Sequence, residues 1–174
     1  DYTEENDTVP KILKETQYFR PNFDMTYAQY LSDLFKLDLK KPVKKFSKGM
    51  KSALNVTIGL ASRTPVTIFD EVYLGMDAPS RDLFYQELLK DQEQHPRIII
   101  LSTHLVSEMD YLFDEVIILN QGEVMLHEDY DTFISRGITI TGRSDVVDDF
   151  IRSKETIHMQ QLGDTKSVII YGDL

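Results

Sequence analysis

The first third of the chain carries apolar residues at helical spacing. In DMTYAQYLSDLFKL (24–37), apolar side chains recur every three or four residues, which predicts an amphipathic helix with Asp24 as its N-cap. The segment VPKILKETQYF (9–19) predicts another helix, with Pro10 in its first turn. A third helix is expected from about Lys48 to Ser62. This part of the chain is therefore expected to be helical.

The middle of the chain changes to strand-like patterns. Two short, nearly continuous apolar runs, VTIFD (66–70) and RIIILST (97–103), are typical of strands buried in a parallel sheet. Between them, PSRDLFYQELLKDQEQ (79–94) predicts an amphipathic helix with a proline at its start. A strand, a helix and a strand in this order imply a right-handed crossover and parallel pairing. The fold class is therefore predicted to be α/β.

The last part is expected to contain hairpins and a small separate unit. A short helix is predicted over LVSEMDYLF (105–113), and the strand-like runs EVIIL and EVMLH flank the turn signal NQG (120–122). A strand, a helix and a second hairpin around Gly163 then form a β-α-β-β unit. A unit of this size cannot close a large core alone. We therefore expect it to dock on the main body, or the native chain to continue past Leu174.

Composition narrows the classes of protein that fit. The chain has 174 residues, of which 41% are hydrophobic, so it can bury a core. Its formal net charge of −10 argues against general binding of a phosphate backbone, and the basic run KKPVKK (40–45) is expected to be a solvated loop. The absence of cysteine excludes disulfides and thiolate metal sites. No apolar run approaches the roughly 20 residues that a membrane-spanning helix needs.

The start of the chain indicates a piece of something longer. The first ten residues, DYTEENDTVP, are acidic, lack an apolar core and do not begin with methionine. They do not resemble a signal peptide. We therefore expect the chain to be a fragment or a trimmed form of a longer protein.

Two adjacent acids close the first predicted strand. In open α/β sheets, ligands bind beyond the carboxyl ends of the strands, where Asp70 and Glu71 are expected to lie. Such a pair could hold a hydrated Mg²⁺ and activate a water. The alternative is a polar strand end, with Asp70 capping the next turn.

His104 follows the second predicted strand. If the two strands are neighbours, His104 and Glu71 lie at the same edge of the sheet. A histidine there could bond a phosphate oxygen or position a water. The alternative is a loop histidine with no chemical role.

Two further positions precede predicted helices. Ser47 and Gly49 stand at the start of the third helix, where free N–H groups attract anions and a glycine admits close approach. The alternative is an ordinary serine N-cap. In YLGMDAPSR, Asp77 precedes the next helix and is open to the same alternative.

The order and spacing of these segments resemble the nucleotide-binding subunit of ABC transporters. FSKGM (46–50) is similar to the LSGGQ signature of that family, and VTIFDE (66–71) to its Walker B strand with the catalytic glutamate. GMD (75–77) is similar to the D-loop, and STH (102–104) to the switch-histidine loop. The resemblance extends over about residues 8–131. It is strongest to bacterial subunits with an SKGM- or SKGQ-type signature, many of which belong to efflux systems.

Three substitutions and two absences depart from the family pattern. Lys48 stands where the signature has its first glycine, Met50 where it has glutamine, and Val72 where a proline follows the glutamate. The chain contains no GxxGxGK[ST] phosphate loop, and no glutamine matches the Q-loop. The resemblance therefore implies a fragment without the N-terminal Walker A lobe, which is expected upstream of Asp1.

The resemblance implies part of a P-loop NTPase fold in three divisions. Residues 1–63 would be a helical subdomain ending in the signature helix. Residues 64–135 would hold the Walker B strand, the D-loop and the switch histidine of the ATPase core. Residues 136–174 would be a small C-terminal α+β accessory unit.

The resemblance also implies a head-to-tail dimer that sandwiches ATP and Mg²⁺. In this scheme Asp70 holds Mg²⁺ through water, Glu71 polarises the attacking water and His104 contacts the γ-phosphate. The signature helix serves the ATP of the partner subunit, and Asp77 communicates across the dimer interface. The positions expected to contact the partner's ATP are Ser47, Lys48 and Gly49.

The implied function is ATP hydrolysis coupled to export across the cytoplasmic membrane. The partners would be a second ATPase subunit and integral membrane permease subunits, with no nucleic acid and with a peripheral location on the cytoplasmic face. The fragment alone is expected to be inactive. Two alternatives stay open, namely the C-terminal lobe of a DNA-repair or chromosome-type ATPase and a non-enzymatic regulatory α/β module.

Overall fold

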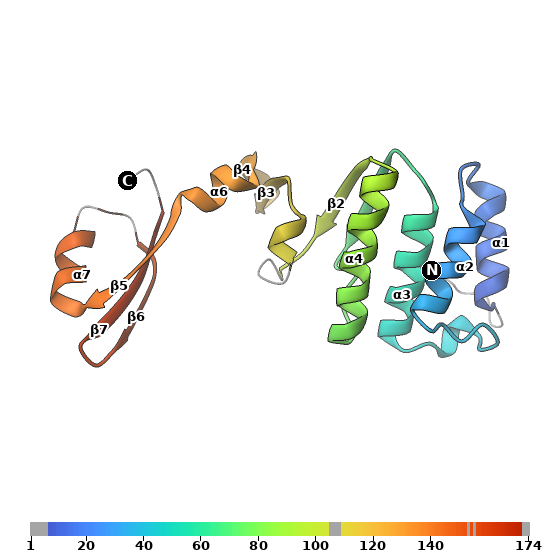
Figure 1. The fold of residues 1–174 in the computed structure, drawn as a ribbon, viewed down its shortest axis with the longest axis horizontal. Helices are drawn as coiled ribbons and strands as arrows, with labels where there is room; N and C mark the ends of the chain where they lie inside the picture. The colour runs from blue at the N-terminus through green and yellow to red at the C-terminus, as the bar shows by residue number, and fades with distance from the viewer. Residues whose placement is uncertain (1–6, 105–108, 153, 155, 172–174) are drawn as a thin grey trace. The chain divides into compact units, whose positions relative to one another are not determined.

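The computed structural model of the chain describes residues 7–104, 109–152, 154 and 156–171 (Figure 1). The chain folds into two compact units, Asp1–Leu112 and Phe113–Leu174. The three divisions expected from the sequence, with boundaries after residues 63 and 135, stay a prediction. No helix in the described ranges is long and apolar enough to cross a membrane.

The first unit alternates helices with a parallel strand pair. Its elements are α1 (Val9–Phe19), α2 (Met25–Leu34), η1 (Val43–Lys45), α3 (Lys48–Ala61), β1 (Val66–Asp70), α4 (Ala78–Gln94), β2 (Ile98–Ser102) and η2 (Asp110–Leu112). The predicted helices and strands between residues 9 and 103 are therefore confirmed. Of the short helix predicted over 105–113, residues 105–108 lie outside the described residues, and the short helix η2 falls within the rest.

Side-chain caps explain where three of these helices begin. The carboxylate of Asp24 accepts a hydrogen bond from the Tyr27 amide at 2.9 Å, which confirms the predicted N-cap of α2. Ser47 caps α3 and Asp77 caps α4 in the same way. In each case a side-chain oxygen satisfies a backbone N–H that the helix itself leaves unpaired.

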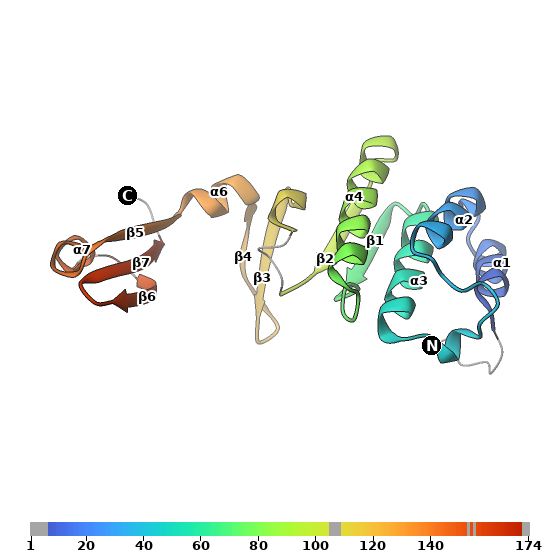
Figure 2. The ribbon, with the colours of Figure 1, turned by 60° about the horizontal axis from the view of Figure 1, so that its bottom comes forward.

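The core of the first unit lies between α3, α4 and one face of the strand pair. Leu54, Leu60 and Phe84 are fully buried, and the Phe69 ring meets the Phe84 ring edge to face at 5.4 Å between centroids. Gly59 of α3 lies directly against the Phe69 ring, where a methyl group would overlap it. Figure 2 shows α3 and α4 beside the two strands.

The strand pair is parallel, as predicted. β1 and β2 align from Val66 opposite Ile98 to Asp70 opposite Ser102. The prediction that both faces are buried is wrong for the part of the chain that the structure describes, because the helices pack on one face only. The opposite face carries four exposed apolar side chains: Val66, Ile68, Ile98 and Ile100.

The second unit contains a hairpin followed by a small three-stranded sheet. Its elements are β3 (Glu115–Asn120), β4 (Glu123–Asp129), α6 (Tyr130–Ser135), β5 (Gly137–Arg143), α7 (Ser144–Ile151), β6 (Thr156–Leu162) and β7 (Thr165–Tyr171). Gln121 and Gly122, both with positive φ, form the turn between β3 and β4, so the predicted hairpin is confirmed. The strand order β5-β7-β6 and the helix α7 confirm the predicted β-α-β-β unit.

One apolar cluster holds the β-α-β-β unit together. Val147 of α7 packs against Val168 and Ile170 of β7, and Ile138 and Ile140 of β5 lie around them. The unit therefore has its own small core.

Candidate functional site

Two polar residues meet where the parallel strands end. Asp70 is the last residue of β1 and lies opposite Ser102, the last residue of β2. The Ser102 hydroxyl donates a hydrogen bond to the exposed Asp70 carboxylate at 2.7 Å. The side chains at the carboxyl edge of the sheet are therefore polar and open to solvent.

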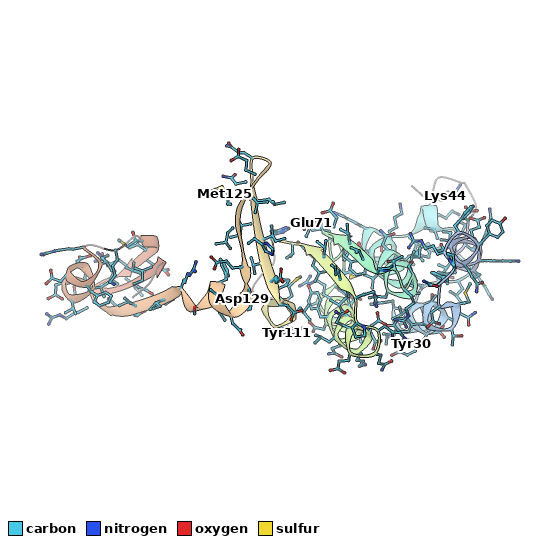
Figure 3. The ribbon with its side chains drawn as sticks, turned by 90° about the horizontal axis from the view of Figure 1, so that it is seen from above. Tyr30, Lys44, Glu71, Tyr111, Met125 and Asp129 are labelled. Atoms are coloured by element: carbon cyan, nitrogen blue, oxygen red, sulfur yellow. The ribbon has the colours of Figure 1, made fainter. Side chains whose placement is uncertain are left out.

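Glu71 begins the turn that follows β1, and its backbone is strained. Its φ is 47°, in the left-handed region that residues other than glycine seldom occupy. Its N–H bonds the Ser102 carbonyl at 3.1 Å, and its own carbonyl accepts from Leu74 at 3.0 Å. Backbone strain of this kind concentrates at functional sites. Figure 3 labels Glu71 among the side chains.

The structure brings Glu71 and His104 into contact. The Nδ1 atom of His104 lies 3.0 Å from Oε1 of Glu71, although 33 residues separate them in the chain. The prediction that the two residues share an edge of the sheet thus agrees with their geometry. The His104 side chain is 65% exposed and that of Glu71 is 30% exposed, so water and ligands can reach the pair.

Tyr73 completes this group and was not predicted from the sequence. Its hydroxyl donates a hydrogen bond to Oε2 of Glu71, lies 3.1 Å from Nδ1 of His104 and accepts from the His104 amide at 3.2 Å. The residue is 3% exposed. A tyrosine two positions after a glutamate carries no motif, so the sequence offered no signal for this contact.

These contacts shift the ionisation of the group. The hydrogen bond from Tyr73, followed by that from His104, lowers the pKa of the Glu71 carboxyl. Burial, followed by the bond to Glu71, raises the pKa of the Tyr73 hydroxyl. At neutral pH the site therefore presents an ionised glutamate held by a neutral tyrosine.

The start of α3 packs against the turn at residues 71–77. Gly49 touches the carbonyl of Gly75 so closely that a methyl group on Gly49 would overlap it. The Ser52 hydroxyl donates to the Leu74 carbonyl at 2.8 Å. The turn therefore joins the strand-end group to the first turn of α3.

Ser47 and Asp77 both act as helix N-caps, which is the alternative that the sequence left open for each of them. The Ser47 hydroxyl accepts from the Met50 amide at 3.2 Å, while Lys48 is exposed. The Asp77 carboxylate accepts from the Ser80 amide at 3.0 Å. Hydrogen bonding to Ser80 lowers the pKa of Asp77. Their roles toward a nucleotide or a second subunit stay predictions.

The strand-end residues fit a loosely held magnesium ion better than a dedicated metal cage. Among the described residues, no group of three or more His, Asp or Glu side chains could hold a metal. Mg²⁺ usually takes one or two protein carboxylates and fills its shell with water and substrate phosphates. The exposed Asp70 carboxylate fits that mode.

The relatives found by comparison with known proteins include transport ATP-binding proteins. No family model matches the sequence. The chain is 33% identical over 92 residues to the lantibiotic transport ATP-binding protein SrtF of Streptococcus pyogenes, covering 53% of this chain and 40% of SrtF. It is 24% identical over 164 residues to the ABC transporter ATP-binding protein YtrB of Bacillus subtilis, covering 94% of this chain and 56% of YtrB.

A solved structure with a similar fold is also an ABC transporter subunit. An ATP-binding subunit of an ABC transporter matches with a TM-score of 0.66 and 22% identity, covering 76% of this chain and 57% of that one. The chain thus spans about half the length of the relatives it matches. Its fold is that of part of an ABC ATPase. By sequence this chain is thus similar to ABC transporter ATP-binding proteins over part of their length, and it shares the fold of such a subunit.

Proposed function

We propose that this chain supplies the water-activating half of an ABC transporter ATPase site, together with the helix end that serves a second site. The contact between Glu71 and His104 at the ends of two parallel strands carries the proposal. It is supported by the similarity to ATP-binding proteins such as SrtF and YtrB.

In this proposal Glu71 accepts a hydrogen bond from the attacking water. Its lowered pKa keeps the carboxylate ionised at neutral pH, and a carboxylate is a stronger acceptor than a neutral acid. His104 lies beside it and offers its exposed ring to a γ-phosphate oxygen. Phosphoryl transfer depends mainly on positioning and charge stabilisation, which these two side chains can provide.

Asp70 would hold the magnesium ion that accompanies ATP. The ion, when bound, neutralises developing charge on the phosphates. Ser102 holds the Asp70 carboxylate through a hydrogen bond of 2.7 Å, which fixes its direction before any ion binds. Loss of this carboxylate is expected to weaken ATP hydrolysis more than ATP binding.

The start of α3 would serve the ATP of a partner subunit in a head-to-tail dimer. Ser47 occupies the Met50 amide, and the first turn of a helix with its positive dipole end is in general a favourable place for a phosphate. Ser47, Lys48 and Gly49 are the proposed contacts, and Asp77 is the proposed residue at the dimer interface. The exposure of Ser47 and Lys48 supports an intermolecular role.

The intact protein is proposed to be an export ATPase. It would work with membrane permease subunits from the cytoplasmic face, without nucleic acid. The name of SrtF, a lantibiotic transport protein, supports a link to antibiotic peptides. The phosphate loop that cradles ATP is proposed to lie in the part of the protein that this chain does not contain.

The decisive experiment replaces the proposed base in a protein that carries this chain together with its phosphate loop. Glu71→Gln is expected to leave ATP binding intact and to reduce hydrolysis by about 100-fold or more. The matched control is Glu93→Gln, an exposed glutamate on α4, which should leave hydrolysis unchanged. Unchanged hydrolysis in Glu71→Gln would remove Glu71 from this role.

A second measurement addresses the chain by itself. We expect the 174-residue chain neither to bind ATP tightly nor to hydrolyse it. Isothermal titration calorimetry with ATP and Mg²⁺ should show no binding at micromolar concentration. Micromolar affinity, with turnover that depends on Glu71, would contradict this expectation.

A further inference from the structure

We infer that Tyr73 is a positioning residue that holds Glu71 and His104 together for ATP hydrolysis. The inference rests on the proposed function, since it gives a role to a side chain that touches both proposed catalytic groups. It begins from one hydroxyl that contacts the loops after both strands.

The Tyr73 hydroxyl connects two segments that are far apart in sequence. On one side it donates to Oε2 of Glu71, in the turn after β1. On the other it accepts from the His104 amide at 3.2 Å and lies 3.1 Å from Nδ1 of the same residue, in the loop after β2. One buried group therefore fixes both the side chain of Glu71 and the backbone and ring of His104.

The tyrosine can do this because its own position is fixed. It is 3% exposed, its ring meets the His104 ring at 63° with 5.8 Å between centroids, and its carbonyl accepts from Met76 at 3.0 Å. A side chain already locked by packing orients its neighbours at little further entropic cost. The hydroxyl thus acts from a rigid base.

Without the hydroxyl, the two catalytic groups would depend mainly on each other. Their direct contact of 3.0 Å joins two side chains that are 30% and 65% exposed. A contact between two exposed polar side chains contributes little and allows many geometries. A small loss of alignment at a phosphoryl-transfer site has a large effect on rate.

The first test is made on the full 174-residue chain and needs no ATP. Tyr73→Phe keeps the ring and removes the hydroxyl, so the His104 amide should exchange with solvent about fivefold faster, the effect of one ordinary hydrogen bond. The His104 ring nitrogens should also shift in ¹⁵N NMR spectra. The Ile100 amide in β2 reports whether the sheet stays intact, and Tyr18→Phe, an 84% exposed tyrosine, is the control.

Unchanged exchange of the His104 amide and unchanged ring signals in Tyr73→Phe would overturn the inference. This result does not depend on whether the protein hydrolyses ATP.

The second test uses a protein that contains this chain and its phosphate loop. There, Tyr73→Phe is expected to lower kcat about 10- to 100-fold with little change in KM for ATP. A wild-type kcat in Tyr73→Phe would also overturn it, with the proposed function still standing. If the parent protein hydrolyses no ATP, the proposed function fails, and the exchange measurement still decides whether Tyr73 bridges the two loops.

Discussion

At the scale of single residues, Glu71 and His104 show what strand order alone can predict. Parallel pairing puts the ends of β1 and β2 at one edge, so residues that follow the two strands are expected to meet there. Tyr73 shows the opposite case. Its place depends on the left-handed backbone of Glu71 and on the turn that follows, which no periodicity or spacing encodes.

The close contact of Gly49 with the Gly75 carbonyl leads to a prediction about stability. Gly49→Ala should destabilise the chain by about 1–3 kcal/mol, because the new methyl group would overlap backbone that cannot rotate away. Gly137→Ala is the control, since a methyl group there would meet its nearest atom at an ordinary 3.6 Å. Urea unfolding measures both. Equal stability of the two variants would contradict the contact.

The lowered pKa of Asp77 predicts how the α4 cap depends on pH. A carboxyl with a lower pKa in the folded chain stabilises the fold above its unfolded pKa of about 3.9. The stabilisation is then lost as the pH falls through the folded pKa. Its cause is the hydrogen bonding to Ser80.

Asp77→Asn should therefore be less stable than the wild type at pH 6, and the difference should shrink as the pH falls below about 4. Urea denaturation of both proteins across this range is the measurement. A difference that grows toward acid pH would have the wrong sign for a lowered pKa.

At the scale of elements, β1 has two faces with very different surroundings. Continuous apolar runs predicted strands buried on both sides, but the pattern records only that the side chains are apolar, not what covers them. In the described part of the chain, Phe69 packs on α3 and α4 and is 4% exposed, whereas the next residue back, Ile68, is 65% exposed.

Substitutions at these neighbouring positions should separate the two faces. Phe69→Ala is expected to lower the free energy of unfolding by about 3–5 kcal/mol, because it empties a buried site. Ile68→Thr is expected to change it by less than about 0.5 kcal/mol, since the side chain is exposed and threonine suits a strand. Denaturant unfolding of the 174-residue chain compares them. A large loss in Ile68→Thr would show that this face is covered.

A buried charge network joins α4 to its neighbours. The Asp91 side chain is 1% exposed and forms two ion pairs. One is with Arg63, which follows α3, and the other is with Arg97, which precedes β2, at 2.6 Å. Arg63 also lies over the Tyr27 ring of α2. The sequence predicted the helices and strand but not this network, because the three charges are 28 and 6 residues apart along the chain.

Removing the shared carboxylate should therefore be severe. Asp91→Ala removes the carboxylate that Arg63 and Arg97 share, leaves Arg63 only its 3.3 Å pair with the more exposed Asp24, and is expected to destabilise the chain by about 3–5 kcal/mol. Asp82→Ala, an exposed aspartate on the same helix, should have little effect. Thermal unfolding at neutral pH measures both. Equal melting temperatures would show that the network contributes no net stability.

At the scale of the whole molecule, the chain consists of two compact units with separate cores. The sequence predicted a small C-terminal β-α-β-β unit, because strand and helix patterns change there. Its predicted start at residue 136 stays a prediction; in the structure, the hairpin before residue 136 belongs to the compact unit that begins at Phe113. Which segments pack together is a property of the folded chain that local patterns do not contain.

Separate cores imply separate responses to a core substitution. Val168→Ala, at a fully buried position of β7, is expected to destabilise the second unit by about 2 kcal/mol, and hydrogen exchange should rise in the described residues of that unit and not in the first unit. Val146→Ala, the same change at a 59% exposed position of α7, is the control. Exchange that rises equally in α3 and α4 would show that the units unfold together.

The contact between Gly49 and Gly75 has a consequence for how a dimer of such chains would work. The turn at residues 71–77 carries the group proposed for one ATP, and the start of α3 carries the group proposed for the other. Glycine puts backbone directly against backbone at their junction, without a flexible side chain to absorb movement. A displacement of the turn at residues 71–77 would therefore also displace the start of α3. In the proposed dimer, ATP bound at one site would thus change the affinity of the other site for ATP. By linkage, binding at the second site would change the affinity of the first by the same factor.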